Sequence, residues 1–512
     1  MRLTQDNESR RDECRSILQS QFAENQQQAL ARKHSISSWR GGARCLGVGV
    51  MLLAVSPSWA ADTTLGNVGK TKLQQDTGDA VQFTCTGFID AGADPLNPVP
   101  PLFETCQAMV QTATNGPNNL NISDSELADG LQHIATEEFA ASGQLGTEVG
   151  SNRINIGINR LVEVRRGAKG FNIAGLSPDT NTLLAANSQW RDSYAGERGG
   201  AAGDSEVWDK LGVFITGNYS TGDRDRTSRT DSFDFDTYGT TLGMDYRFTE
   251  NLILGAAVTY NDLNSDFDKR STVPGGGVDA DGWGGFVYGT YYQDRFYIDG
   301  LAGYAKSDYD VKRKISITNN SFDNPDTPID EQVFNGEDIK ANVKGSPDSD
   351  DYIASVGGGY NFGQGALSYG PYGRLTYLKV EVDDYKESGA GEFGLNLAVD
   401  GQDWKSVTSV LGGQISYASS RSFGVVMPQG RLAWVHEYED DSTKMKATYI
   451  DDPRKNTLLA ITDDPDSDYF ELGVGVSAVF KNGVQAFFNY DTVLGMDDFT
   501  IHMFTLGGRW EF

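Results

Sequence analysis

The sequence contains no run of about 18 apolar residues, which is the length that a membrane-spanning helix needs. Hydrophobic residues make up 38% of the chain, and the mean hydropathy is −0.43. These values exclude a helical membrane protein. They do not exclude a membrane β-barrel, because every second residue of a barrel strand faces the lumen, where polar side chains are tolerated.

Basic residues are also scarce. The chain has 43 Lys and Arg residues against 71 Asp and Glu residues, which gives a formal net charge of −28. No basic stripe of the kind that follows a phosphate backbone is present, so we exclude nucleic acid as a partner.

Residues typical of catalysis are few. The chain has 4 His residues, and no G-x-S-x-G nucleophile motif occurs. His436 and Glu437, near a strand end, could mimic an acid–base pair. We therefore expect no enzyme activity, no catalytic residue and no cofactor. The acidic loops match no EF-hand spacing, so we expect a solvated acidic surface and no metal site, with bound calcium as the alternative.

The start of the sequence has the pattern of an export signal. Arg40 and Arg44 precede a short apolar run at 45–55, and small residues follow it up to Ala60. A charged flank, a short apolar core and a small-residue exit predict a signal peptide over residues 1–60, with an unusually long amino-terminal extension.

Cysteines are limited to four, and two of them lie in the predicted signal peptide. The remaining pair is Cys85 and Cys106. Because the periplasm is oxidising, we expect these two residues to form a disulfide, with two free thiols as the alternative.

Alternating apolar and polar residues are abundant after about residue 208. The last segment shows this pattern, because successive side chains of a strand point to opposite faces. One face carries the apolar residues Phe504, Leu506, Trp510 and Phe512, and the other carries Thr505, Arg509 and Glu511. We predict twelve strands, near 208–221, 234–248, 251–264, 279–292, 295–309, 350–363, 366–384, 403–419, 423–439, 467–480, 483–494 and 500–512.

The connections between these segments alternate between short and long. The long ones lie near 222–233, 265–278, 310–349, 385–402, 440–466 and 495–499. Outer-membrane barrels have short periplasmic turns and long outer loops. We therefore predict an all-β transmembrane barrel of 12 antiparallel strands over 208–512, whose last strand pairs with the first and leaves no open edge in lipid.

The barrel segment resembles a known family. The stretches GTTLGMDYRFTENLILGAAVTY, YGPYGRLTYLKVEVDDY, GGQISYASS, PQGRLAWVHEYED, YFELGVGVSAVFKNGVQAFFNYD and GGRWEF occur in order and at strand spacing. Together they resemble the autotransporter β-domain of type V secretion, over about residues 205–512. The resemblance implies a twelve-stranded outer-membrane barrel in Gram-negative bacteria, with a helix through its pore and an upstream passenger outside the cell. It also implies an assembly signal in the last strand, at Phe504, Leu506, Trp510 and Phe512.

The upstream region departs from the usual family member because it is short and lacks the long repeats of a β-helical passenger. We expect residues 61–150 to form a short, mainly helical, passenger-like region. A capping box, S-x-x-E, at Ser123 to Glu126 marks one helix start. We expect residues 151–207 to supply a pore helix and a linker, although Ile154, Ile156 and Ile158 also alternate as in a strand.

The segment from 151 to 170 is a basic island in an acidic protein. We expect its arginines to pair with lumen carboxylates such as Glu471 and Glu511 and so to hold a plug; an exposed basic helix is the alternative. The pore-helix cations in this prediction are Arg153, Arg160, Arg165 and Arg166. The residues expected to face the lumen are Arg374, Arg431, Glu471, Arg509 and Glu511.

The predicted function is that of an autotransporter translocator that displays a small amino-terminal passenger at the cell surface. The alternative is a structural or adhesive outer-membrane barrel whose amino-terminal region stays periplasmic or plugs the pore. The expected partners are outer-membrane lipid and lipopolysaccharide, the outer-membrane barrel assembly machinery, and host or other cell surfaces. We expect the protein to be a monomer.

Overall fold

A computed structural model describes residues 64–90, 99–116, 118–135, 137–167, 210–269, 273–321, 333–480 and 484–511. The predicted signal peptide and most of the predicted linker lie outside these ranges. Within them, no helix is long and apolar enough to cross a membrane.

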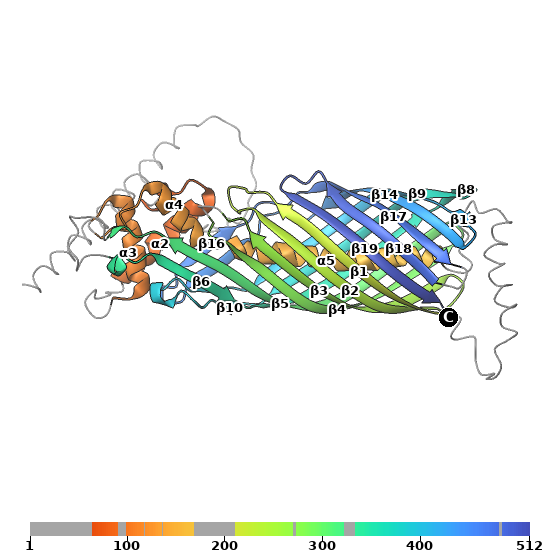
Figure 1. Ribbon diagram of the computed structural model, residues 1–512, viewed down its shortest axis with the longest axis horizontal. Coiled ribbons are helices and arrows are strands. Elements are labelled where there is room, and N and C mark those ends of the chain that lie inside the picture. Colours follow the sequence, from red (N-terminus) through yellow and green to blue (C-terminus); the bar gives the residue numbers. More distant parts are fainter. Residues whose placement is uncertain are drawn as a thin grey trace, which may run out of the picture.

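Twelve long antiparallel strands form a closed barrel, as predicted (Figure 1). Each strand pairs with the next, and the first pairs with the last, Gly212 opposite Glu511 and Arg224 opposite Phe499. The barrel strands are β1 (Leu211–Arg224), β2 (Phe233–Arg247), β3 (Leu252–Phe267), β4 (Gly276–Gln293), β5 (Phe296–Ile317), β7 (Asp348–Tyr360), β9 (Leu367–Val382), β12 (Gln402–Tyr417), β14 (Gly424–Glu437), β17 (Asp468–Phe480), β18 (Val484–Leu494) and β19 (Phe499–Glu511).

The two faces of the last strand differ as the alternating pattern predicts. Leu506 and Trp510 point outward and are 64% and 46% exposed, whereas Arg509 on the inner face is only 3% exposed. Large apolar side chains are exposed on the other barrel strands as well, for example Leu242, Val287 and Leu411. Exposed apolar residues around a whole barrel wall are typical of a surface that faces lipid.

The long connections are more structured than predicted. The ranges 310–349, 385–402 and 440–466 were expected to be loops, but they hold further strands that lengthen the barrel at one end. β6 (Ile339–Gly345) pairs with the end of β5. A separate four-stranded sheet contains β10 (Tyr385–Lys386), β11 (Leu397–Val399), β15 (Lys444–Tyr449) and β16 (Thr457–Ile461). Short runs of alternately buried residues, such as Ile339, Ala341 and Val343, give these segments an apolar face.

The described connections at the other end of the barrel are tight turns, with the short strands β8 (Phe362–Gln364) and β13 (Ser419–Arg421) beside them. The amino-terminal end of β1 and the carboxyl-terminal end of β19 lie at this short-turn end (Figure 1).

Three helices form a compact unit that we call the head, at the end of the barrel with the long connections (Figure 1). It consists of α2 (Lys72–Asp90), α3 (Pro101–Thr114) and α4 (Asp124–His133), preceded by a short 3-10 turn at Gly66–Val68. The predicted capping box begins α4: the Ser123 hydroxyl accepts from the Glu126 backbone N–H, and the Glu126 carboxylate accepts from the Ser123 backbone N–H. Cys85 on α2 and Cys106 on α3 form a disulfide.

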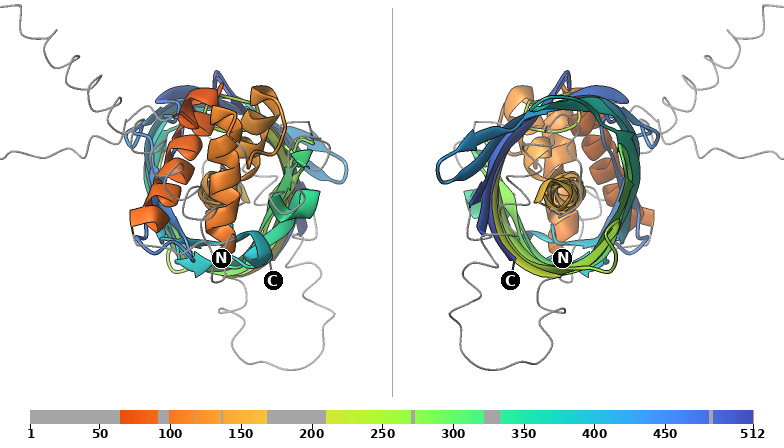
Figure 2. Two further views of the ribbon diagram at one scale, coloured as in Figure 1. Left: turned by 90° about the vertical axis from the view of Figure 1, so that its left-hand side faces the viewer. Right: turned by 90° about the vertical axis from the view of Figure 1, so that its right-hand side faces the viewer.

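Helix α5 (Glu137–Gly167) runs through the centre of the barrel, as the end-on view shows (Figure 2). A helix satisfies its own backbone hydrogen bonds, which explains why Ile154, Ile156 and Ile158 are helical here and do not form a strand. The helix starts at Glu137, so the predicted boundary at residue 150 was wrong and falls inside a continuous element.

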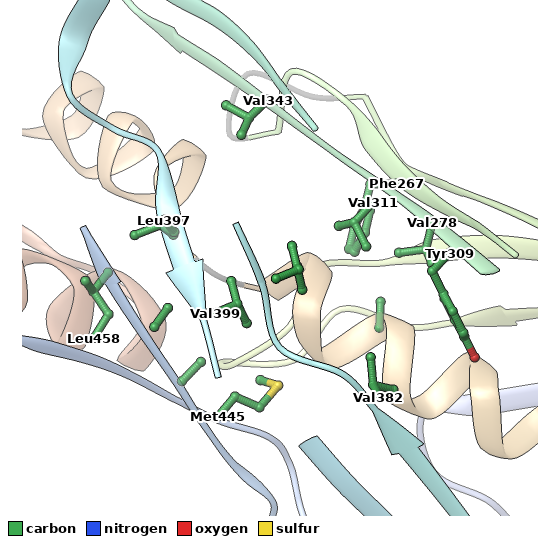
Figure 3. Packing of buried hydrophobic residues seen from close by; sticks show 14 of the residues in the cluster. Phe267, Val278, Tyr309, Val311, Val343, Val382, Leu397, Val399, Met445 and Leu458 are labelled. Carbon is green, nitrogen blue, oxygen red and sulfur yellow. The ribbon is translucent and has the colours of Figure 1, made fainter. Parts of the chain in front are cut away.

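One apolar core joins the head to the extended strands. It includes Leu102 and Met109 of the head together with Leu397 and Met445 of the separate four-stranded sheet. Figure 3 shows part of this core, with Tyr309 and Val382 of the barrel strands together with Leu397, Met445 and Leu458 of the four-stranded sheet. The head is therefore packed onto the barrel, and burial of this shared apolar surface stabilises the contact.

The plugged pore and its docked head as the candidate functional site

Three arginines of α5 pair with three aspartates of the barrel wall. Arg153 contacts Asp351 on β7, Arg160 contacts Asp245 on β2, and Arg165 contacts Asp299 on β5. The first two pairs are almost completely buried. Charge-assisted bonds in a buried site are costly to break singly, because the remaining charge has no partner and little access to water.

Aromatic rings support two of these arginines. The Arg160 guanidinium lies 4.2 Å from the ring centroid of Phe214, and the Arg165 guanidinium lies 3.9 Å from that of Tyr297. Stacking of a desolvated cation on a ring adds roughly 1–2 kcal/mol of attraction. The plug is thus held by ion pairs and by cation–π contacts from the same side chains.

One expected partner of these arginines, Glu471, was wrong. Glu471 faces the lumen, but it pairs with Arg374 of the wall at 3.4 Å and not with α5. The side chains of Arg166 and Glu511, and all of Phe512, lie outside the described part of the chain. Strand alternation fixes which carboxylates point inward, but the axial position of α5 decides which of them an arginine meets.

Sequence reasoning missed the three aspartate partners. Asp351 lies on β7 and is 1% exposed. Asp245 and Asp299 lie on the inner faces of membrane strands. An ionisable residue inside a membrane segment is expensive unless it is paired, and this signal would have pointed to all three residues.

Two further predicted lumen residues, Arg431 and Arg509, also lie on the inner wall. Arg431 donates to Asp491 and to the Asn159 side chain on α5, both at 2.9 Å. Arg509 donates to Asp245 at 3.0 Å. Glu163 of α5 accepts from the side chains of Gln429 and Gln485, each at 3.4 Å. Polar groups in the carboxyl-terminal half of α5 are therefore hydrogen-bonded to polar groups of the barrel wall.

Glycines on α5 allow the helix to pass close to the wall. A Cβ atom at position 143 would lie 1.9 Å from Trp404, and one at position 157 would lie 2.0 Å from Leu301. Glycine is unfavourable in a helix interior by about 1 kcal/mol, so these positions serve the close fit of the helix. Two of the cavities beside α5 measure about 50 Å³ and about 40 Å³, enough for a few water molecules.

The head contacts loops from several barrel connections. The Thr105 hydroxyl donates to the Phe393 carbonyl at 2.9 Å, and the Leu120 carbonyl accepts from the Asn320 backbone at 2.8 Å. The Gln132 amide donates to Asp231 at 3.0 Å. Since these partners follow β9, β5 and β1 respectively, three separate connections hold the head over the mouth of the barrel.

The remaining candidates for chemistry have ordinary surroundings. His436 lies 3.0 Å from Asp468 on the exposed surface, where Trp434 also donates to that carboxylate. His133 contacts the Ser316 carbonyl at 2.7 Å. No group of three or more His, Cys, Asp or Glu side chains within the described ranges is arranged to hold a metal ion.

Comparisons with known proteins agree with this architecture. Residues 213–491, more than half of the chain, match the family model described as autotransporter β-domain. Outer membrane protein A of Rickettsia conorii is 23% identical over 327 residues, which cover 62% of this chain and 15% of that relative. Outer membrane protein A of Rickettsia rickettsii is 22% identical over 327 residues, which cover 62% of this chain and 13% of that relative. The chain thus spans a small part of the length of these relatives.

Solved structures with a similar barrel include the translocator domain of autotransporter NalP from Neisseria meningitidis, with a TM-score of 0.44, 14% identity, and coverage of 65% of this chain and 98% of that chain. They also include the transport unit of autotransporter AIDA-I from Escherichia coli, with a TM-score of 0.38, 16% identity, and coverage of 64% and 97%. On the strength of the family match, this chain belongs to the autotransporter β-domain family, and its translocator is an outer-membrane barrel that follows an amino-terminal helical region.

Proposed function

We propose that this autotransporter exports its own amino-terminal head through the barrel and keeps it at the cell surface as a docked cap, with α5 left in the pore. The observation that carries the proposal is the position of the head. It lies at the end with the long connections, whereas both ends of the barrel segment lie at the short-turn end (Figure 1). Short turns are periplasmic in outer-membrane barrels, so the head is on the outer side.

The course of α5 supports the same route. Its first turn lies beside Gly276 at the start of β4, and its last turns lie beside Asp299 near the start of β5. The helix thus spans the lumen from the head to the short-turn end, as expected for a segment that follows an exported passenger. In this role the last strand is read by the barrel assembly machinery, the outer wall contacts lipid and lipopolysaccharide, and the head faces host or other cell surfaces.

Retention of the head is favoured over release. The head shares its apolar core with the four-stranded sheet at this end of the barrel. Release of the head would expose residues such as Leu102 and Leu397 to water. The protein thus also fits the alternative of a structural surface barrel, in which the head closes the pore.

Epitope insertion tests the orientation. A tag between Cys85 and Cys106 should be stained on intact cells. A matched tag in the short turn at Thr249 and Glu250 should be stained only after permeabilisation. Staining of the head tag only in permeabilised cells would show that the head stays periplasmic and would overturn the proposal.

A further inference from the structure

One carboxylate, that of Asp245, joins the plug to the closing seam of the barrel. Asp245 lies on β2 and is 2% exposed. It accepts from Arg160 of α5 and, at 3.0 Å, from Arg509 of the last strand. Residues from three distant parts of the sequence thus meet at one buried anion.

Arg509 reaches Asp245 by crossing the first strand. The barrel closes where β1 pairs with β19, and Arg509 is paired there with Phe214 of β1. Its acceptor lies one strand further on, because Asp245 is paired with Gly212 on the other edge of β1. The Arg509 side chain therefore passes over β1 and ties β19 to β2.

Gly212 makes this crossing possible. A Cβ atom at position 212 would lie 2.6 Å from Nη2 and 2.8 Å from Nε of Arg509. Any side chain at this position would occupy the path of the guanidinium. The Phe214 ring, two residues along β1, stacks on Arg160. On the inner face of β1, Arg509 thus covers Gly212, and Arg160 of the plug covers Phe214, the next inward-facing residue.

We propose that Asp245 couples closure of the barrel to insertion of the plug. With one arginine present, the carboxylate has one compensating charge. With the seam closed and α5 in place, the carboxylate has two compensating charges, because Arg160 and Arg509 both donate to it. Loss of Arg160 should therefore loosen the β1–β19 seam, although Arg160 belongs to neither of these strands.

Two other plug arginines provide matched controls. Arg165 is also buried, pairs with an aspartate and stacks on a ring, but its partner Asp299 lies on β5, away from the seam. Arg153 pairs with Asp351 on β7. Their removal should loosen the plug without acting on β1 and β19 directly.

Hydrogen exchange of the full-length protein in detergent tests the coupling. Arg160→Gln should speed exchange of the amides in 212–217 and 504–510 by roughly tenfold or more, the ratio expected for one charge-assisted hydrogen bond. Arg165→Gln should leave these amides nearly unchanged. Asp245→Asn, which removes the negative charge that Arg160 and Arg509 share, should have the largest effect.

A second variant separates the seam from the plug. Gly212→Ala keeps all three charged residues but obstructs Arg509, so it should also speed exchange at the seam. If Arg160→Gln alone prevents a folded, heat-modifiable barrel while Arg165→Gln does not, the coupling is supported. Equal effects of Arg160→Gln and Arg165→Gln at the seam, failure of both variants to assemble, or an unchanged seam in Gly212→Ala would overturn it.

Discussion

The ion pair between Arg153 and Asp351 offers a quantitative test of how the plug is held. Replacing Arg153 by Met removes the cation and leaves the Asp351 carboxylate buried, with Ser349 as a remaining hydrogen-bond donor at 3.1 Å. Breaking one side of a buried pair costs about 3–5 kcal/mol. If α5 leaves the pore in the open state, where water reaches Asp351, this cost falls on the plugged state alone. The population of the open state should then rise by roughly a hundredfold to several thousandfold.

Single-channel recording in planar bilayers measures this population as the fraction of time spent at high conductance. Lys306→Gln is the control, because Lys306 and Asp348 form an exposed pair at 3.8 Å. An exposed pair contributes about 1 kcal/mol or less, so this variant should change the open fraction by about fivefold at most. The double variant Arg153→Met with Asp351→Leu should return most of the plugging, because apolar residues of similar size replace buried pairs at little cost. The reasoning is refuted if Arg153→Met opens no more often than Lys306→Gln, or if the double variant opens as often as Arg153→Met.

Three further predictions concern the head and its contact with the barrel. Burial raises the pKa of Glu138, at the start of α5, to about 8, and Arg313, Glu387 and Asp231 are the charged groups around it. The unfolded chain releases the Glu138 proton near pH 4.5, whereas the folded state keeps it up to about pH 8. The unfolding midpoint should therefore fall as pH rises from about 4.5 to 8, and Glu138→Gln should flatten the fall; parallel profiles for the two proteins would contradict this. Replacing both Cys85 and Cys106 by Ser should lower the free energy of unfolding of the head by about 2–4 kcal/mol, measured by urea denaturation of the full-length protein, and a reductant should act on the wild type but not on the variant. Gly394 has a φ of +67°, and a Cβ there would lie 2.5 Å from Leu102, so Gly394→Val should make the head protease-sensitive while the barrel stays heat-modifiable. Gly391→Ala is the control in the same loop, because the nearest atom is 3.6 Å away, and it should leave the head protected. Equal protease sensitivity of the two variants would rule out local docking as the cause.

The barrel was predictable because its information is local. Side-chain alternation along a strand has a period of two, so Leu506 and Arg509 could be placed on opposite faces from their positions alone. The same alternation gave the strand count, and the short and long connections then indicated a closed outer-membrane barrel. The helix cap at Ser123 was equally local, since the capping box lies within four consecutive residues.

The contacts inside the lumen were not predictable in the same way. The partner of Arg160 depends on the axial position and rotation of α5, which is set by the fit of positions such as Gly157 against Leu301. The outer strands were missed for a related reason. β11 spans only Leu397–Val399, and its apolar residues become a core only when α3 of the head packs nearby.

The continuity of α5 has a mechanical consequence. A helix of 31 residues is about 46 Å long and is stiff along its axis. Arg153, Arg160 and Arg165 are fixed to this one rod, and each is anchored to a different strand of the wall. A pull on the head along the barrel axis therefore loads the three anchors together and does not peel them away one by one. The tension is shared among β2, β5 and β7, so the barrel wall carries the load as a whole.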